Sequence, residues 1–212
     1  MKKKGLLIVL SGFAGTGKGT VVKKLLDKYN EQYALSISMT TRVPRNYETN
    51  GVEYHCVETE VFEEKIKADG FLEYACYCGN YYGTPKDFIV QNMEAGRDVI
   101  LEIEIQGALQ VKEQYPETTL IFLLPPSAQV GYERLKNRGT ETEEVIRERM
   151  SRAGEESQGI EQYDYILIND DIDTCVESLH QMIQSEKQRA FRNIAFIENT
   201  RKELVDLKKG EL

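Results

Sequence analysis

The sequence has few of the residues that build metal and redox sites. Its 212 residues include two histidines and four cysteines. Cys76 and Cys78 are separated by one residue rather than two, and neither this spacing nor the number of histidines fits a zinc pattern. We therefore expect the thiols to be free, partly buried side chains in a reducing compartment. The residues concerned are His55, His180, Cys56, Cys76, Cys78 and Cys175.

Positive charge is also scarce. The chain has 27 lysines and arginines against 35 aspartates and glutamates, which gives a net charge of −8. A nucleic-acid polymer binds a basic surface, so DNA and RNA are disfavoured as partners. Any anionic ligand must be met by local positive charge that acts against the overall field.

Long apolar runs are absent. No stretch reaches the roughly 18 apolar residues that a membrane-spanning helix needs, so no membrane partner is expected. The first twelve residues, MKKKGLLIVLSG, resemble the start of a secretory signal. Their apolar part is short, however, and a strand followed by a phosphate loop accounts for every residue from Gly5 to Thr20. This interpretation favours a cytoplasmic protein.

Apolar runs that alternate with helical patterns predict an α/β fold. The spacing of Val21, Val22, Leu25 and Leu26 places them on one face of a helix. Five apolar runs predict a five-stranded parallel sheet flanked by helices. These runs are residues 6–10, 34–38, 99–105, 119–124 and 165–169.

Residues 40–83 interrupt this alternation. They contain four glycines and short β-prone pieces such as VEYHCV and YACYCGNYYG, which predict a small inserted lobe of mixed β structure. Residues 173–212 are polar and helical in pattern, and we expect a closing helix followed by a tail.

The stretch SGFAGTGKGT follows the first predicted strand and opens the first predicted helix. Its glycines allow successive backbone N–H groups to turn toward phosphate oxygens, and Lys18 adds a mobile cation. The alternative is a tight turn with an ordinary surface lysine. Gly19 stands where such loops usually have serine or threonine, which makes direct ligation of Mg²⁺ by Thr20 doubtful. The predicted ATP-binding loop residues are Gly12, Phe13, Ala14, Gly15, Thr16, Gly17, Lys18, Gly19 and Thr20.

Arg42 and Arg45 lie close together in SISMTTRVPRNYETNGVEY, with hydroxyl side chains nearby. Arginine meets phosphate oxygens in a forked geometry, so the pair suggests a second anion site. The spacing is equally compatible with two solvated arginines on a loop.

Several segments together resemble the guanylate kinase family. They are SISMTTRVPRNYETNG, GNYYGTPK, VILEIEIQGA, LPPS, RLKNRGTETEEVIRERM and YDYILINDD, in that order, and the likeness runs from about Leu6 to Gln184. It implies a P-loop NTPase-type domain at residues 4–187 and a helical tail at 188–212. Within the domain it implies a core at 4–38 and 84–187, a GMP-binding lobe at 39–83 and a helical lid at about 134–158.

The implied activity is transfer of the γ-phosphoryl group of ATP to GMP, and to dGMP, giving ADP and GDP with Mg²⁺. This reaction belongs to purine nucleotide metabolism and GMP recycling in the cytoplasm. Both a monomer and a homo-oligomer are compatible with the sequence. Two rival functions are a phosphopeptide-binding module built on the same domain and a kinase for another nucleoside monophosphate or a phosphorylated sugar.

The resemblance also implies which residues bind GMP. Glu73 and Thr84 would read the guanine, because a carboxylate can accept from the N1–H and the N2 amino group together. Adenine offers no such pair and would leave a buried carboxylate unpaired, at a cost of about 1–3 kcal/mol or more. The alternative for Glu73 is a surface charge. The full GMP-binding set is Ser38, Arg42, Arg45, Glu48, Tyr54, Glu73, Tyr82, Thr84 and Glu102.

Glu102 and Glu104 are two residues apart in a predicted strand, so their side chains are expected on the same side. The family has an acidic residue at each position, usually aspartate at the second. Glu104 is therefore a candidate metal ligand, directly or through water. The alternative is that one of the two only pairs with a lid arginine.

No histidine is placed to act as a general base, and none is needed, because the acceptor is already an anionic phosphate oxygen. Positioning and positive charge would do the catalysis. The implied catalytic residues are Lys18, Arg42, Arg134, Arg138 and Arg149. Asn169 is expected to help hold adenine, whereas Arg147 is interpreted as a surface residue. Phe13 and Ala14 stand where the family usually has proline and serine.

Overall fold

The structure is a computed structural model that describes residues 3–45, 48–77, 79–137, 139 and 142–209. The chain divides between Val176 and Glu177 into two compact units, Met1–Val176 and Glu177–Leu212. The first unit contains both β-sheets and most of the helices. The described elements of the second unit are helices, with a short turn at Gln188 and Arg189.

A five-stranded parallel sheet forms the centre of the first unit, as the sequence predicts. Its strands lie in the order β2, β7, β1, β8, β9, and every neighbouring pair is parallel. Strand β1 occupies the middle, which places the loop that follows it at the centre of the carboxyl edge of the sheet. The strands are β1 (Leu7–Gly12), β2 (Tyr33–Ser36), β7 (Asp98–Leu101), β8 (Thr119–Leu124) and β9 (Tyr165–Ile168).

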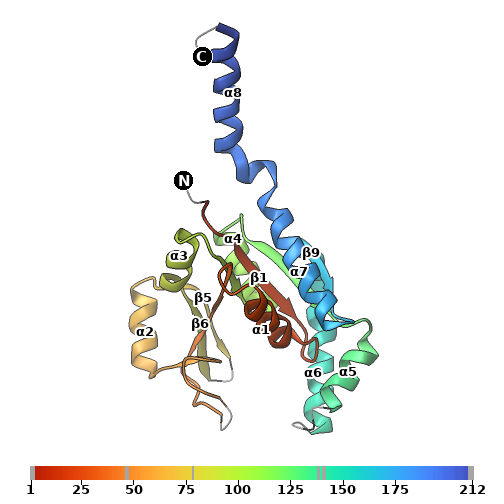
Figure 1. Cartoon of the computed structure of the whole chain (residues 1–212). Coiled ribbons are helices and arrows are strands. Elements are labelled where there is room, and N and C mark those ends of the chain that lie inside the picture. The colour runs from red at the N-terminus through yellow and green to blue at the C-terminus, as the bar shows by residue number, and fades with distance from the viewer. Residues whose placement is uncertain (1–2, 46–47, 78, 138, 140–141, 210–212) are drawn as a thin grey trace. The chain divides into compact units, whose positions relative to one another are not determined.

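The helices of the first unit connect these strands (Figure 1). Helix α1 packs on β1 and β2, and α4 packs on β1 and β8. Figure 1 shows the inserted lobe on one side of β1 and helices α5 and α6 on the other. The helices are α1 (Lys18–Lys28), α3 (Lys86–Glu94), α4 (Ile105–Gln114), α5 (Ala128–Asn137), α6 (Glu143–Glu156), the 3₁₀ helix η1 (Ser157–Gln162) and α7 (Ile172–Lys187), which continues into the second unit.

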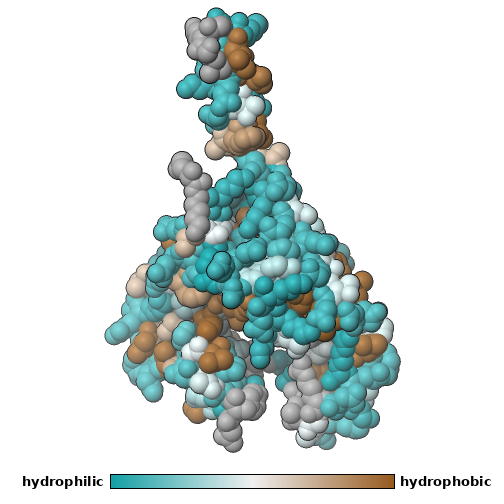
Figure 2. Space-filling model, viewed as in Figure 1, coloured by the Kyte–Doolittle hydropathy of each residue, from teal (hydrophilic) through white to brown (hydrophobic). Residues whose placement is uncertain are grey.

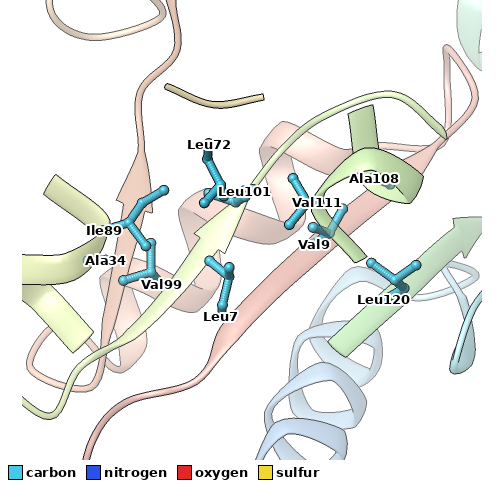
Figure 3. Packing of buried hydrophobic residues seen from close by; sticks show 10 residues of the cluster. All are labelled: Leu7, Val9, Ala34, Leu72, Ile89, Val99, Leu101, Ala108, Val111 and Leu120. Carbon is cyan, nitrogen blue, oxygen red and sulfur yellow. The ribbon is translucent and has the colours of Figure 1, made fainter. Parts of the chain in front are cut away.

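The core forms because alternate residues of each strand point to opposite faces of the sheet. Val9 is in register with Leu101 on one side and Leu120 on the other, and all three are fully buried. Figure 3 shows these side chains with Ala108 and Val111 of α4. The same cluster includes Leu72 of the inserted lobe, so the apolar core extends from the central sheet to that lobe.

The inserted lobe contains a second sheet in the order β4, β3, β6, β5. Strands β3 and β4 are parallel and the other pairs are antiparallel, so the prediction of mixed β structure is confirmed. Phe62 of helix α2 is fully buried and stacks on Phe71 and Tyr81 at 4.3 and 5.2 Å between ring centroids. The elements are β3 (Met39–Thr40), β4 (His55–Cys56), α2 (Thr59–Lys67), β5 (Phe71–Tyr77) and β6 (Asn80–Pro85).

One predicted strand is shorter than its apolar run. Residues 99–105 were expected to form one strand, but β7 ends at Leu101 and α4 begins at Ile105. Ile105 is buried from the first turn of α4, so its apolar character belongs to a helix rather than to the strand. Glu102 and Glu104 therefore lie in the connecting loop, and the prediction that they share one side of a strand is wrong. Similarly, β2 ends at Ser36 rather than at Ser38.

The second unit contains the rest of α7, the 3₁₀ helix η2 (Ala190–Asn193) and α8 (Ile194–Lys209). Glu186 is 1% exposed and forms ion pairs with Arg189 and Arg192 at 3.3 and 3.2 Å. Helix α8 has no buried residue.

The surface is mostly hydrophilic on the face that Figure 2 shows, with hydrophobic areas over the inserted lobe. Val52, Val61 and Tyr74 are among the exposed apolar residues of that lobe. Within the described part of the chain, we find no helix that is both long and apolar enough to cross a membrane.

Candidate active site

The loop between β1 and α1 requires glycine at two central positions. Gly15 and Gly17 have φ angles of 84° and 89°, in the left-handed region that side chains disfavour. A Cβ on Gly15 would lie 2.8 Å from the carbonyl oxygen of Gly131, and one on Gly17 would lie 2.6 Å from Nδ2 of Asn169. This strand–loop–helix geometry aims backbone N–H groups and the N-terminus of α1 at one point, as a phosphate site needs.

Lys18 opens helix α1, and its side chain folds back over this loop. Its Nζ donates hydrogen bonds to the carbonyl oxygens of Gly12 and Phe13. The hydroxyl of Thr16 also donates to the carbonyl oxygen of Phe13, at 2.9 Å. The amine is thus held at the loop, where it can exchange backbone carbonyls for phosphate oxygens.

Asn169 connects the end of β9 to the phosphate loop. Its side chain is buried, and Nδ2 donates to the carbonyl oxygen of Thr16 at 2.7 Å. Arg134 of α5 donates to the carbonyl oxygens of Asn169 and Asp170 at 2.9 and 3.3 Å. The structure therefore brings Asn169 and Arg134 together beside the loop. Arg134 binds backbone carbonyls in this conformation.

Of the other two predicted lid arginines, the structure describes Arg149. Arg149 is partly exposed on α6. The prediction for Arg138 falls outside the described residues. Arg147 has a side chain that is 80% exposed and lies 3.8 Å from Glu143, as expected for a surface residue.

Arg42, Arg45 and Glu48 form one charged cluster in the inserted lobe. Nη2 of Arg42 donates to both carboxylate oxygens of Glu48 at 2.8 Å, and the backbone N–H of Arg45 donates to Glu48 at 2.8 Å. The side chain of Glu48 is 5% exposed, whereas that of Arg45 is 56% exposed. Burial favours the protonated acid, but the Arg45 N–H and the Arg42 guanidinium outweigh it and hold the pKa of Glu48 below its ordinary value.

Two tyrosines complete this cluster. The guanidinium of Arg42 lies 5.5 Å from the ring centroid of Tyr54, and the rings of Tyr54 and Tyr82 are 6.0 Å apart. Burial, helped by Tyr82, raises the pKa of the Tyr54 hydroxyl, so that hydroxyl remains a hydrogen-bond donor at neutral pH. Ser38 is joined to this region because its carbonyl oxygen accepts from the N–H of His55 at 2.9 Å. Guanidinium and hydroxyl donors thus gather around one place, as a phosphate monoester needs.

A partly buried carboxylate lies elsewhere in the same lobe. Glu73 on β5 is in register with Thr84 on β6, and the Thr84 hydroxyl donates to Oε1 of Glu73 at 2.5 Å. Thr84 is buried. Burial raises the pKa of Glu73, although the hydrogen bond from Thr84 opposes this shift. The second oxygen, Oε2, stays available to a ligand with N–H donors.

Glu102 lies between the phosphate loop and the tyrosine cluster. Its carboxylate oxygens are 4.0 Å from the position of a Cβ on Gly19, and its negative charge adds to the raised pKa of Tyr54. Burial raises the pKa of Glu102 itself, while Lys18 opposes this shift and Glu104 adds to it. One carboxylate is thus close enough to act electrostatically on both halves of the site.

Glu156 at the end of α6 belongs to the same acidic region, although the sequence did not single it out. Burial and the charge of Glu104 raise its pKa, and Lys18 opposes the shift. Its neighbour in the chain, η1, packs against the start of α4, because a Cβ on Gly159 would lie 3.3 Å from Ile105. In the sequence, the only feature that pointed to Glu156 was its position in a run of charged residues with a helical pattern.

Phe13 is explained by an aromatic contact behind the loop. Its ring lies 5.0 Å from that of Phe122, which in turn lies 5.0 Å from Tyr163. Tyr163 has its hydroxyl buried beside Ser11, and burial raises the pKa of that hydroxyl to about 12. Phe13 therefore packs the loop onto the sheet through its side chain.

The carboxylates suit a hard divalent cation. Glu102 and Glu104 supply oxygen donors near Lys18. Among the described residues, no cluster of three or more histidine, cysteine, aspartate or glutamate side chains could hold a metal ion. Mg²⁺ commonly keeps several waters and is bound through one or two carboxylates plus substrate phosphates.

A family model described as guanylate kinase matches residues 4–186, which is most of the chain. The chain belongs to the guanylate kinase family. It is 50% identical over 193 residues to a guanylate kinase of Caldanaerobacter subterraneus, covering 91% of this chain and 93% of the relative. It is 43% identical over 212 residues to one of Clostridium acetobutylicum, covering 100% and 97%.

A solved relative has the same fold. The crystal structure of guanylate kinase from Anaplasma phagocytophilum superposes with a TM-score of 0.73 and 30% identity, covering 90% of each chain. The family match is consistent with the two groups of predicted anion-binding residues. It also covers every segment on which the resemblance was based.

Glu48 is the residue of the predicted GMP site whose contacts in the structure are clearest. Replacing Glu48 with glutamine should raise KM for GMP about tenfold, because an amide accepts through one oxygen only and its NH₂ faces the Arg42 guanidinium. Steady-state kinetics at saturating ATP measure this change. The control is Glu53→Gln in the same segment, where an exposed carboxylate accepts from the N–H of Thr49. Equal KM values for the two variants would contradict the role assigned to Glu48.

Proposed function

We propose that the protein transfers the γ-phosphoryl group of ATP to GMP, giving ADP and GDP. The observation that carries this proposal is the position of Glu102, whose charge acts on Lys18 of the phosphate loop and on Tyr54 of the tyrosine cluster. Two anion sites therefore lie on either side of one carboxylate. That arrangement suits a reaction between two phosphate groups, and the family of the chain supports it.

The donor nucleotide would bind at the loop after β1. Backbone N–H groups of Gly12–Thr20 and the N-terminus of α1 would hold the ATP phosphates, with Lys18 at the outer ones. Asn169 lies beside this loop through its bond to Thr16, and we place the adenine near it.

The acceptor would bind in the inserted lobe. Ser38, Arg42, Arg45, Tyr54 and Tyr82 would hold the GMP phosphate. In the free protein, Glu48 neutralises and orients Arg42. The phosphate would compete with Glu48 and with the carbonyl oxygen of Val43 for the donors of the Arg42 guanidinium.

Guanine would be read by the Glu73–Thr84 pair. Oε2 of Glu73 would accept from the base, and Oε1 is already oriented by the Thr84 hydroxyl. AMP would leave Oε2 of the partly buried Glu73 carboxylate without a donor, which costs about 1–3 kcal/mol. The 2′-hydroxyl is not part of this recognition, so dGMP should also be a substrate.

The chemical step needs no general base, because the attacking oxygen of GMP is already ionised. The remaining tasks are to bring two anions together and to stabilise the charge on the moving group. Lys18 and the arginines would supply positive charge, and Arg134 on α5 and Arg149 on α6 would add to it when these helices close over ATP. Arg138 would have the same role, and it lies outside the described residues. Closure would also exclude water, which otherwise competes as the acceptor.

Glu104, with Glu102 beside it, would hold Mg²⁺ through its waters. When bound with ATP, this ion supplies charge neutralisation of the β- and γ-phosphates. We place the reaction in the cytoplasm, where ATP and GMP are available.

The proposal is tested by measuring ADP formation from ATP with GMP, dGMP, AMP and UMP in parallel. We expect fast turnover with GMP, slower turnover with dGMP and almost none with AMP or UMP. Turnover that prefers AMP or UMP would show another nucleoside monophosphate kinase. No turnover with any of the four would favour a binding module.

A further inference from the structure

Gly107 lies in the first turn of α4, where nothing in the backbone explains a glycine. It is not among the glycines with positive φ, and glycine costs about 1 kcal/mol relative to alanine inside a helix. The sequence therefore gives up helix stability at this position, and a local packing reason is needed.

The group that explains the glycine is the carboxylate of one residue, Glu73. A Cβ on Gly107 would lie 3.2 Å from Oε2 of Glu73 and 3.5 Å from its Cδ. The next atom, Cδ1 of Ile103, is also 3.5 Å away, which is ordinary contact. The closest contact that the missing side chain avoids is therefore with Glu73, across the boundary between α4 and β5.

The two oxygens of Glu73 have different surroundings. Oε1 accepts from the Thr84 hydroxyl at 2.5 Å, and Thr84 is itself buried. Oε2 lies over the bare backbone of Gly107. A methyl group at position 107 would push the carboxylate by a few tenths of an ångström, and the Thr84 bond limits how it can turn.

We propose that Gly107 is a specificity-determining position, at which the absence of a side chain lets Glu73 present its carboxylate to the guanine base. This inference rests on the proposed function, in which Glu73 reads the N1–H and the N2 amino group. Two parallel hydrogen bonds to one carboxylate depend steeply on angle and distance. A small displacement of Glu73 therefore weakens base recognition without touching the reacting phosphates.

The test compares Gly107→Ala with Gly154→Ala. Gly154 also lies within a helix, α6, and a Cβ there meets nothing within 4 Å. The two variants share the same gain in helix propensity and differ in the contact with Glu73. Kinetic constants are measured with GMP and with IMP, which keeps the N1–H but lacks the N2 amino group.

We expect Gly107→Ala to raise KM for GMP about tenfold and to leave kcat within about twofold, since the lost interaction is made equally in the ground state. The ratio of kcat/KM for GMP over IMP should fall about fivefold, because the extra bond to the N2 amino group is weakened. Gly154→Ala lies in the lid helix α6 and does not contact Glu73, so it should retain the parent KM for GMP and the parent GMP-over-IMP ratio. In a Glu73→Gln background, Gly107→Ala should add little, because the group it displaces is already changed.

Parent-like KM and parent-like GMP-over-IMP preference in Gly107→Ala would overturn the proposal. So would a Gly107→Ala protein that fails to fold while Gly154→Ala folds, because the glycine would then serve packing of α4 on β5. Failure of the proposed function itself looks different, since the unmodified protein would then show no preference for GMP.

Discussion

Replacing Lys18 with alanine is expected to lower kcat by about 10³-fold while the protein stays folded. Lys18 is held at the phosphate loop by the carbonyl oxygens of Gly12 and Phe13, and its amine would be the mobile cation nearest the ATP phosphates under the proposed function. Removal of one well-placed donor to developing charge costs about 10²–10³ in rate, and here a full charge is lost as well. The measurement is kcat with saturating ATP and GMP, with circular dichroism to verify the fold.

The matched control is Lys23→Ala. Lys23 lies on the same helix α1, one turn further on, and is exposed. Its loss should change kcat by less than about twofold, because exposed charges contribute little at this distance. Near-normal turnover by the Lys18 variant would mean that the loop after β1 does not hold the donor phosphates.

The second large effect is expected from Glu73→Gln. This variant should lose about 10²-fold in kcat/KM for GMP, because the amide offers one acceptor and turns an NH₂ toward the guanine donors. The free protein should become about 1 kcal/mol more stable at neutral pH, because a buried charge is removed while the amide oxygen can still accept from Thr84. Kinetics and thermal unfolding measure the two effects on the same samples. The exposed Glu63→Gln on α2 serves as the control and should change neither.

The raised pKa of Glu73 also predicts a pH dependence. A carboxyl whose pKa is higher in the folded state stabilises the fold most below its unfolded pKa, and this contribution is lost as pH rises through the folded pKa. The stability gain of Glu73→Gln should therefore vanish below pH 4.5, the ordinary value, and reach its full size at neutral pH. Binding of GMP should weaken as the pH falls toward the raised pKa of Glu73. The weakening should begin at a higher pH than for a glutamate with an ordinary pKa. Calorimetric titration with GMP across this range measures the effect, and a flat profile would contradict the assignment of Glu73.

The central sheet was predictable because its strands are short apolar runs bounded by glycine, charged residues or helical patterns. The runs at 119–124 and 165–169 correspond closely to β8 and β9. The error in the run at 99–105 has a physical cause, since a buried helix start and a buried strand are both apolar over a few residues. The end of β7 at Leu101 is fixed by the sheet edge, which sequence periodicity does not show.

Residues of the candidate site were predictable from the sequence where the residue type has one common chemical role in such a motif. The glycines and Lys18 of the loop are of this kind. Sequence spacing alone did not decide whether Arg42 and Arg45 form an anion site or are two solvated arginines. The structure adds the buried side chain of Glu48, which accepts hydrogen bonds from both residues. Residues whose role depends on distant contacts could not be found from sequence. Glu156 and Gly107 meet their partners only when α6 and α4 are folded against the core and the inserted lobe.

The account depends on one claim, that two anion sites on either side of Glu102 hold ATP and GMP at the same time. Isothermal titration of the whole protein with GMP, with and without a non-hydrolysable ATP analogue, tests it most directly. We predict that GMP binds at one site per chain both with and without the analogue. GMP should stay bound when the analogue dissociates. Absence of GMP binding in both conditions, or competition between GMP and the analogue for one site, would contradict the account.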